Sequence, residues 1–370
     1  MTLDDLRRAA VARSLLTPTS LQRALDAFGF VQADPIRAPA RAQDLTLRHR
    51  VAGYRAGDLE RQYARLDVHE DSFVNYGFVT SAVQALMHPR GGPVPWPAGR
   101  GRHVRALLEF VRGRGAVHPR EVDEHFSHGT VINYWGGSSS ATTHLMEAMH
   151  YRGLLRVIRR EAGIRIYAAH AHPPVPRDAA TRRAHLDALV DVVVRKYAPL
   201  PAASLSTLVR RLRYAVPQWR GDLDRTLQRA KGRLAHARVD GGEWYWLPDD
   251  VPVVPDGDGR VRLLAPFDPI VWDRRRFEIL WGWAYRFEAY TPESKRKLGY
   301  YALPLLWRDR VIGWGNVSVK AGTLHATFGY VASRPRERTF RQALDEELDR
   351  LRVFLGLEST ADRRGRSRQA

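Results

Sequence analysis

The chain of 370 residues is 44% hydrophobic and carries a formal net charge of +19, with a pI of about 10.7. It contains no cysteine, which excludes disulfides, thiol nucleophiles, zinc–thiolate sites and iron–sulfur clusters. Neither a signal peptide nor a run of about 18 apolar residues occurs, so the sequence predicts a soluble, cytoplasmic protein.

The basic surplus indicates a nucleic-acid partner. The chain has 59 Lys and Arg residues against 40 Asp and Glu residues, and basic side chains gain free energy by releasing the counterions condensed on phosphate. Compositional drift towards arginine is the alternative, since only five of the basic residues are lysines. Such drift does not remove acidic residues, however, and the surplus over 40 carboxylates is large.

The first hundred residues predict a mostly helical unit. Helices are expected over 3–15 and 20–28, followed by a short apolar run at 30–34 and a helix near 38–47. A Gly- and Pro-rich stretch at 91–101 ends the unit.

The apolar run leads into the motif Gln32-Ala33-Asp34-Pro35. Side chains two residues apart in an extended segment point the same way, and a proline favours an extended conformation in the residue before it. Gln32 and Asp34 would then face one site, where a carboxylate beside an amide can orient and deprotonate water. An Asp before Pro is also a common turn former or helix cap, and Gln is often only solvated, so a purely structural role stays open. The nearby arginines suit a polyanion: Arg37, Arg41, Arg48 and Arg50.

The middle of the chain contains two copies of one order of elements, three helices followed by a two-stranded hairpin, which is the winged-helix plan. In 101–172 the helices are expected over 102–112, from about 119 and over 141–152, and the strands over 154–158 and 164–168. In 173–250 the helices are expected over 181–197, 203–213 and 222–232, and the hairpin turns at Asp240-Gly241-Gly242.

From residue 251 the pattern changes to strands rich in β-branched and aromatic residues. They are expected over 260–264, 300–306, 310–319 and 323–328, with a terminal amphipathic helix over 339–355 and a disordered basic tail at 358–370. The first hundred residues are interpreted as a third, more diverged copy of the winged-helix plan. The predicted fold class is therefore α+β, with three tandem winged-helix units (1–100, 101–172 and 173–250) around a carboxy-terminal, mostly antiparallel β domain (251–357).

No motif predicts a metal ion or an organic cofactor. His170 and His172 lack a third ligand and lie in a predicted linker, and His69 lacks the histidine partner of a zinc helix. The Asp-Gly-Asp-Gly stretch at 256–259 lacks the downstream acids of a calcium loop.

Two basic clusters, at 272–276 and 295–301, alternate with aromatic residues, a combination that suits phosphate contacts and base stacking. A solvated basic face is the alternative. For Trp135, which precedes a predicted recognition helix, a core position and a DNA contact both stay open. The candidate DNA contacts are Arg37, Arg41, Arg48, Trp135, Ser139, Arg274, Arg276, Lys295, Arg296 and Lys297.

Two separated motifs resemble the signatures of the AlkZ/YcaQ DNA glycosylases. One is Gln-Ala-Asp-Pro-Ile-Arg with the following Ala-Arg-Ala-Gln-Asp-Leu, at 32–45. The other is Leu-Ala-Pro-Phe-Asp-Pro-Ile-Val-Trp-Asp-Arg at 264–274, continued by Tyr-Tyr-Ala-Leu-Pro at 300–304. The resemblance spans roughly 6–357, and the segment 129–140 departs from the family's pattern.

The resemblance implies three winged-helix units around a β domain and the excision of bulky alkylated purines, including both halves of DNA interstrand crosslinks. It also implies that Gln32 and Asp34 are the catalytic pair, in the Gln-x-Asp form of the YcaQ branch. The expected partner is double-stranded DNA with alkylated or crosslinked purines. The expected protein is a nucleoid-associated monomer that needs no cofactor.

The chemistry of such lesions fits these two residues. A purine alkylated at N7 is positively charged and leaves without protonation, so the enzyme has to stabilise an oxocarbenium-like sugar and deliver water. Asp34 can do both, while Gln32 holds the water. A Schiff-base mechanism needs an amine, and no lysine precedes Lys196, so a monofunctional glycosylase is expected. The five lysines from Lys196 onward and the α-amino group keep the Schiff-base alternative open.

Two other functions compete with this interpretation. A winged-helix transcriptional regulator would share the charge and the repeats, but it usually binds as a two-fold dimer and gives Gln32 and Asp34 no task. A nuclease would need a cluster of carboxylates for metal ions, and none is found in the sequence.

Overall fold

The computed structural model describes residues 1–15, 17–90, 96, 100–126, 129–132, 138–172, 174, 176, 178–249 and 258–357. The described residues form two compact units. Unit 1 combines Met1–Leu59, Asp191–Leu208 and the chain from Ala230 onward, and unit 2 combines Glu60–Val190 and Val209–Arg229. The predicted basic tail at 358–370 lies outside the described residues.

Unit 1 begins with helices whose ends are set by local capping. In α1 (Leu3–Ser14), Thr2 and Asp5 form a capping box, and in α2 (Leu21–Phe28) the Ser20 hydroxyl accepts a hydrogen bond from the Arg23 backbone. Gly29 ends α2 in the left-handed conformation, with φ of 63°. This turn leads directly into β1 (Phe30–Gln32), and α3 (Ala42–Leu47) follows after a loop.

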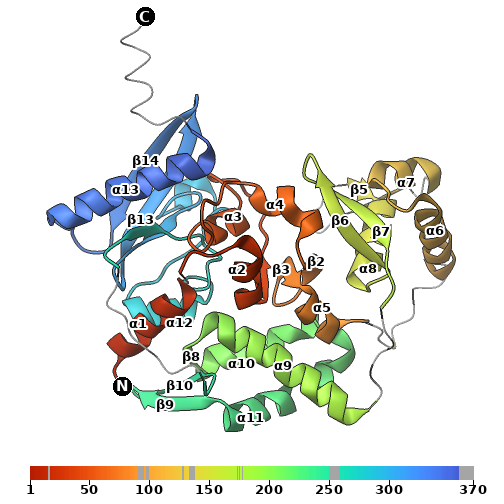
Figure 1. The fold of residues 1–370 in the computed structure, drawn as a ribbon, viewed down its shortest axis with the longest axis horizontal. Helices are drawn as coiled ribbons and strands as arrows, with labels where there is room; N and C mark the ends of the chain where they lie inside the picture. Colours follow the sequence, from red (N-terminus) through yellow and green to blue (C-terminus); the bar gives the residue numbers. More distant parts are fainter. Residues whose placement is uncertain are drawn as a thin grey trace, which may run out of the picture. The chain divides into compact units, whose positions relative to one another are not determined.

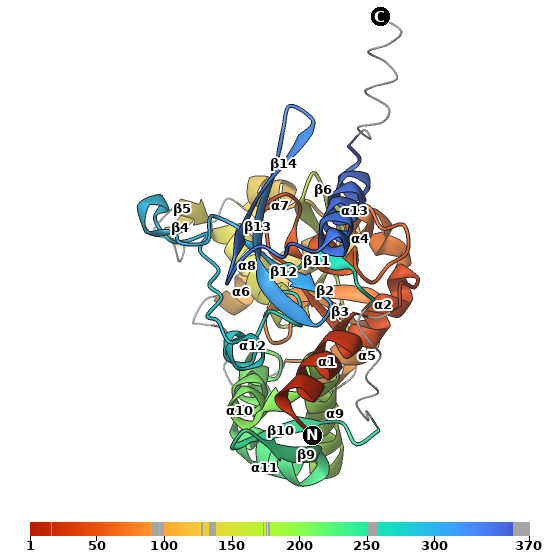
Figure 2. The same ribbon diagram turned by 90° about the vertical axis from the view of Figure 1, so that its left-hand side faces the viewer.

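The carboxy-terminal part of unit 1 is an antiparallel sheet with a helix on one face. Within the described residues its strand order is β11-β12-β13-β14, and α13 (Arg338–Leu355) lies against it, as the two views show (Figures 1 and 2). A short helix, α12 (Arg274–Trp281), precedes β12. The strands are β11 (Val261–Leu263), β12 (Leu303–Trp307), β13 (Arg310–Lys320) and β14 (Thr323–Tyr330).

A hydrophobic core lies beneath α12 in unit 1. Phe277 is fully buried, and its ring contacts those of Trp281, Trp283 and Tyr285 at centroid distances of 5.0, 5.4 and 5.8 Å. Aromatic pairs at these distances add to the stabilisation that burial provides. The core therefore holds α12 in place.

A second small sheet in unit 1 has the strand order β8-β10-β9, all antiparallel. The turn between β9 and β10 has positive φ at Asp240 and Gly241, 46° and 78°, as a two-residue hairpin requires. The predicted hairpin is therefore confirmed. The strands are β8 (Leu200–Pro201), β9 (Ala235–Val239) and β10 (Gly242–Trp246). In chain order, α9 (Ala179–Tyr197) precedes β8, and α10 (Ala202–Arg211) and α11 (Leu223–Arg233) come between β8 and β9.

Unit 2 consists of helices and antiparallel hairpins. Its elements include β2 (Val68–Ser72), β3 (Tyr76–Thr80), α5 (Ser81–Met87), α6 (Arg100–Arg114), α7 (Pro119–Phe126), β4 (Thr130–Ile132), β5 (Ser138–Ser140), α8 (Ala141–Tyr151), β6 (Leu155–Glu161) and β7 (Ile164–Ala169). Helix α8 lies against the β6–β7 hairpin (Figure 1). Helix α4 (Asp58–Gln62) spans the point in the sequence where unit 1 ends at Leu59 and unit 2 begins at Glu60.

The α+β class and the antiparallel carboxy-terminal sheet are confirmed. Helices α6, α7 and α8 and the β6–β7 hairpin lie where the sequence predicts a winged-helix unit, with the additional β4–β5 pair inserted before α8. The number of winged-helix units and the predicted domain boundaries stay predictions.

Candidate active site

Strand β1 and the loop after it hold both residues of the Gln32-x-Asp34 motif in buried positions. Each of the two residues is 8% exposed. The strand is anchored by Phe30 and Val31, both 1% exposed, and by Lys196, whose ammonium group donates a hydrogen bond to the Phe30 carbonyl. The strand that carries the motif is therefore rigid, and a catalytic site with precisely placed side chains needs such a support.

The Asp34 carboxyl group is held through one of its oxygens. Its Oδ1 accepts a hydrogen bond of 2.9 Å from the Ile36 backbone N–H, and its own backbone N–H donates to Gln43 Oε1 at 3.2 Å. Burial raises the pKa of Asp34, against the opposing effect of the Ile36 hydrogen bond. Within the described residues Oδ2 accepts no hydrogen bond, so it is the oxygen that can take a proton from water.

The second motif of the sequence reaches Gln32 directly. The Trp272 indole N–H donates a hydrogen bond of 2.7 Å to Gln32 Oε1. The Trp272 ring also contacts the ring of Tyr197, with a centroid distance of 5.3 Å. Residues 240 positions apart in the chain thus share one site.

The turn that carries Trp272 is fixed by buried ion pairing. Asp268 and Arg50 form a bidentate pair, with N–O distances of 2.6 and 3.0 Å, and both side chains are fully buried. The Trp272 backbone N–H donates to the Asp268 carbonyl at 2.8 Å. Asp273 then caps α12 by accepting from the Arg276 backbone N–H at 3.1 Å.

Aromatic residues of the carboxy-terminal part lie in the electrostatic field of Asp34. Burial, and secondly the charge of Asp34, raise the pKa values of Tyr290 and Tyr301. Phe287 contacts both rings edge-on, at centroid distances of 6.0 and 5.3 Å. Tyr301 is 3% exposed, and its hydroxyl has no hydrogen-bond partner within the described residues. A buried hydroxyl in this state can donate to a bound water or a substrate atom.

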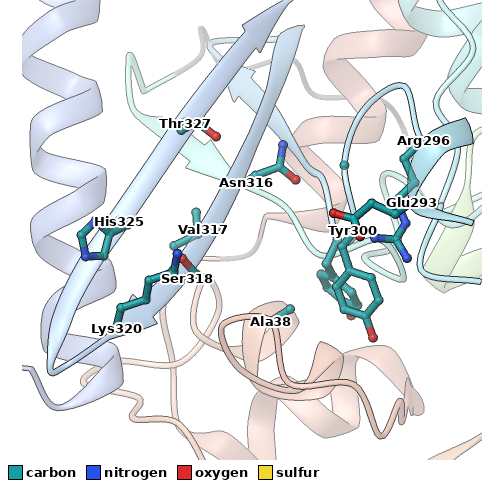
Figure 3. Close-up of a pocket in the computed structure, with 12 residues that line it drawn as sticks. Ala38, Glu293, Arg296, Tyr300, Asn316, Val317, Ser318, Lys320, His325 and Thr327 are labelled. Atoms are coloured by element: carbon teal, nitrogen blue, oxygen red, sulfur yellow. The ribbon is translucent and has the colours of Figure 1, made fainter.

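A groove of about 690 Å³ adjoins this region. Figure 3 shows Lys320, Ser318 and His325 at one end and Glu293, Arg296 and Tyr300 at the other, with Ala38 of the loop after β1 between them. The cationic and hydroxyl groups are suited to a phosphodiester. The remaining lining residues are Gly299, Tyr301, Asn316, Val317 and Thr327.

The predicted DNA contacts divide into exposed and buried side chains. Arg37, Lys295 and Lys297 are exposed, and Arg41 and Arg296 are half-buried. Trp135 lies outside the described residues, and Ser139 belongs to β5, where only its backbone is described.

Three of the predicted arginine contacts serve the interior of unit 1 instead. Arg276 is fully buried and donates to the carbonyls of Tyr197 and Pro269, the latter at 3.1 Å. Arg48 pairs with Glu347, which is itself fully buried. Arg274 donates to a backbone carbonyl and lies 4.5 Å from the centre of the Tyr285 ring. Because these guanidinium groups are bound within the fold, we assign them structural roles.

Several residues of this region do not stand out in the sequence. Lys320, Ser318 and His325 come from the β13–β14 hairpin, whose pattern indicates only strands. Trp272 and Tyr301 lie inside the second motif, but nothing in their spacing connects them with Gln32 or Asp34. Only the resemblance of both motifs to one family indicates that the two motifs act together.

In the described part of the chain, no group of three or more His, Asp or Glu residues is placed to hold a metal ion. The rings of His170 and His172 are in contact, with a centroid distance of 4.3 Å, and the ring of His172 stacks on that of His88 at the same centroid distance.

No helix among the described residues has the length and apolar content needed to cross a membrane.

Comparison with known proteins identifies the family. The family model described as "DNA glycosylase AlkZ-like" matches residues 25–354. Among solved structures, the chain is similar to the DNA glycosylase AlkZ of Streptomyces sahachiroi, with a TM-score of 0.62 and 14% sequence identity over 96% of this chain and 97% of that one. That likeness shows a shared fold, while the family match covers both motifs of the site. The chain therefore belongs to the AlkZ-like DNA glycosylases, and it is a hydrolase that acts on N-glycosyl bonds in DNA.

Proposed function

We propose that the protein excises N7-alkylated purines from double-stranded DNA, including both halves of interstrand crosslinks, with Asp34 as the general base and Gln32 as the residue that holds the water. The observation that carries this proposal is the state of Asp34. It is a buried carboxyl group with a raised pKa, held through Oδ1 by the Ile36 backbone and beside a groove lined by cationic side chains. Perturbed carboxyl groups in such surroundings are typical of catalytic sites.

The proposed reaction balances without a cofactor. Asp34 Oδ2 accepts a proton from water as the water oxygen forms a bond to C1′ of the deoxyribose. The bond from C1′ to N9 breaks, and its electron pair leaves with the base, which neutralises the positive charge of the alkylated ring. The carboxylate also stabilises the positive charge that develops on the sugar. The products are a neutral alkylpurine and an intact abasic site.

The position of Lys196 supports a monofunctional reaction. The side chain of Lys196 contacts β1, but the residue is only 3% exposed. Its ammonium group donates a hydrogen bond to the Phe30 carbonyl and lies 4.5 Å from the centre of the Phe30 ring. Burial lowers its pKa, but an amine bound in this way is held in the core away from a sugar. Sodium borohydride should therefore trap no covalent adduct between the protein and DNA, and a trapped adduct would contradict the proposal.

The DNA strand is proposed to follow the groove beside the Asp34 loop. Arg296 and Lys320 lie at its two ends (Figure 3), and Arg37, Lys295 and Lys297 are exposed in the same unit. Phosphate contacts of this kind position the duplex without reading its sequence. One chain supplies both motifs of the site, so the proposed reaction needs no second copy, and chromosomal DNA as substrate would place the enzyme at the nucleoid.

Release of 7-methylguanine from methylated duplex DNA tests the proposal. The wild-type protein and Asp34→Asn are compared with EDTA present, beside a nitrogen-mustard crosslinked duplex. Release by the wild type and its loss in the variant would support a metal-independent glycosylase with Asp34 as base. If both proteins bind these substrates and neither releases base, the proposed lesion class is wrong.

A further inference from the structure

We infer that Trp272 is a positioning residue for the reaction, because it fixes the orientation of the Gln32 side-chain amide. An indole N–H can only donate a hydrogen bond. The atom that it meets at 2.7 Å must therefore be the amide oxygen, and the NH2 group of Gln32 points away from the indole. Without such a donor, an amide can turn its oxygen and nitrogen to either side.

The indole is itself held in place from two directions. Its backbone is anchored to the turn that the buried Arg50–Asp268 pair fixes, and its ring packs on Tyr197. Tyr197 is fully buried, and its carbonyl accepts from the buried guanidinium of Arg276. Because the indole N–H is already held in place, it needs little reorganisation when the substrate binds. Effective positioning of a catalytic group requires such a rigid support.

The orientation decides how Gln32 can handle water, and this step rests on the proposed roles of Gln32 and Asp34. With its oxygen bound to Trp272, Gln32 presents N–H groups that donate to one lone pair of the water. The water in turn donates one proton to Asp34 Oδ2, so the second lone pair of its oxygen is directed at C1′. If the amide were turned, its oxygen would accept a hydrogen bond from the water, and neither lone pair of the water would be oriented by Gln32.

Trp272→Phe tests this inference, because it removes the N–H donor and keeps an aromatic ring. We expect base release under single-turnover conditions to slow roughly 10- to 100-fold, the scale of effect that misplacement of a reacting group produces. The affinity for lesion-containing DNA should not change. In a Gln32→Ala background, the same substitution should cause no further loss, because residues that act through one another are not additive.

Trp281→Phe is the matched control. Trp281 is also partly buried, packs on an aromatic ring and donates from its indole, here to the Asp309 carbonyl at 2.9 Å. It has no bond to Gln32, so its loss should leave the rate of base release unchanged. The pH dependence of the rate should also be the same in Trp272→Phe as in the wild type, because Gln32 does not titrate and Asp34 is untouched.

A second measurement does not depend on how well Trp272→Phe folds. The chain has ten tryptophans, and one indole N–H signal in the nitrogen–proton spectrum should shift in Gln32→Ala. Absence of any shift, a wild-type rate for Trp272→Phe, or equal slowing by the Trp281 control would each overturn the inference. An inactive wild type would instead refute the proposed function, and normal activity of Gln32→Ala would refute the role of Gln32.

Discussion

Asp34 has to be ionised to act as the proposed base, although its burial makes ionisation costly. The residue is 8% exposed, and burial raises the pKa of its carboxyl group above the ordinary value of 3.8. A base works only when ionised, so the rate of base release should fall on the acid side as the pH drops through this raised pKa. A pH–rate profile with a substrate whose own charge is constant would check this. An acid limb at or below 3.8 would contradict it.

The same burial predicts that Asp34→Asn separates activity from stability. Because the pKa of Asp34 is higher in the folded chain than in the unfolded chain, ionisation lowers the free energy of unfolding as the pH rises through the folded pKa. Asparagine keeps an oxygen for the Ile36 N–H and carries no charge. We expect the variant to lose about 10²- to 10⁴-fold in rate and to melt at the same or a higher temperature at pH 7. A lower melting temperature would show that the carboxylate stabilises the fold.

The sequence predicts these two residues and not the groups around them. Gln32 and Asp34 could be proposed because their spacing and the following proline are local properties. The hydrogen bond from Trp272 depends on two segments far apart in the chain, and no periodicity encodes it. The sequence predicts Arg276 as a DNA contact for a similar reason, since its carbonyl partners exist only once the fold has formed.

At the scale of elements, the Arg50–Asp268 pair should be one of the main supports of unit 1. Removing one member of a buried pair leaves an uncompensated charge, which typically costs about 3–5 kcal/mol. Asp268→Ala should lower the free energy of unfolding by that amount in a urea titration. Asp349→Asn is the control, because Asp349 is 66% exposed and pairs with Arg352 at the surface of α13, where the loss should be under about 1 kcal/mol. Equal effects of the two substitutions would contradict this role.

Most strands and long helices could be predicted because apolar periodicity and turn residues mark them locally. The β9–β10 turn and the terminal helix α13 are examples. The sequence predicts only a basic cluster where α12 lies, because the first turn of this helix is Arg-Arg-Arg. Its helical state comes from the Asp273 cap and from Phe277 and Leu280, which are buried in the core.

At the scale of the whole molecule, the net charge of +19 predicts DNA binding that weakens steeply with salt. Lys320→Gln removes a cation from the groove and should reduce the slope of the logarithm of the binding constant against the logarithm of salt concentration by about 1. Lys231→Gln in α11 changes the net charge equally but removes no groove residue. Fluorescence anisotropy at several salt concentrations would measure both slopes, and equal slopes for the two variants would argue against a groove contact.

Unit 1 is built from three separate stretches of chain, and Trp272 belongs to the last of them. During synthesis, Gln32 therefore leaves the ribosome long before the partner that orients it. A nascent chain shorter than 272 residues lacks that partner, so the complete site forms only when most of the protein has been made. The same arrangement offers a way to divide the enzyme: two fragments, neither of which holds both motifs, should recover hydrolysis only when they reassemble.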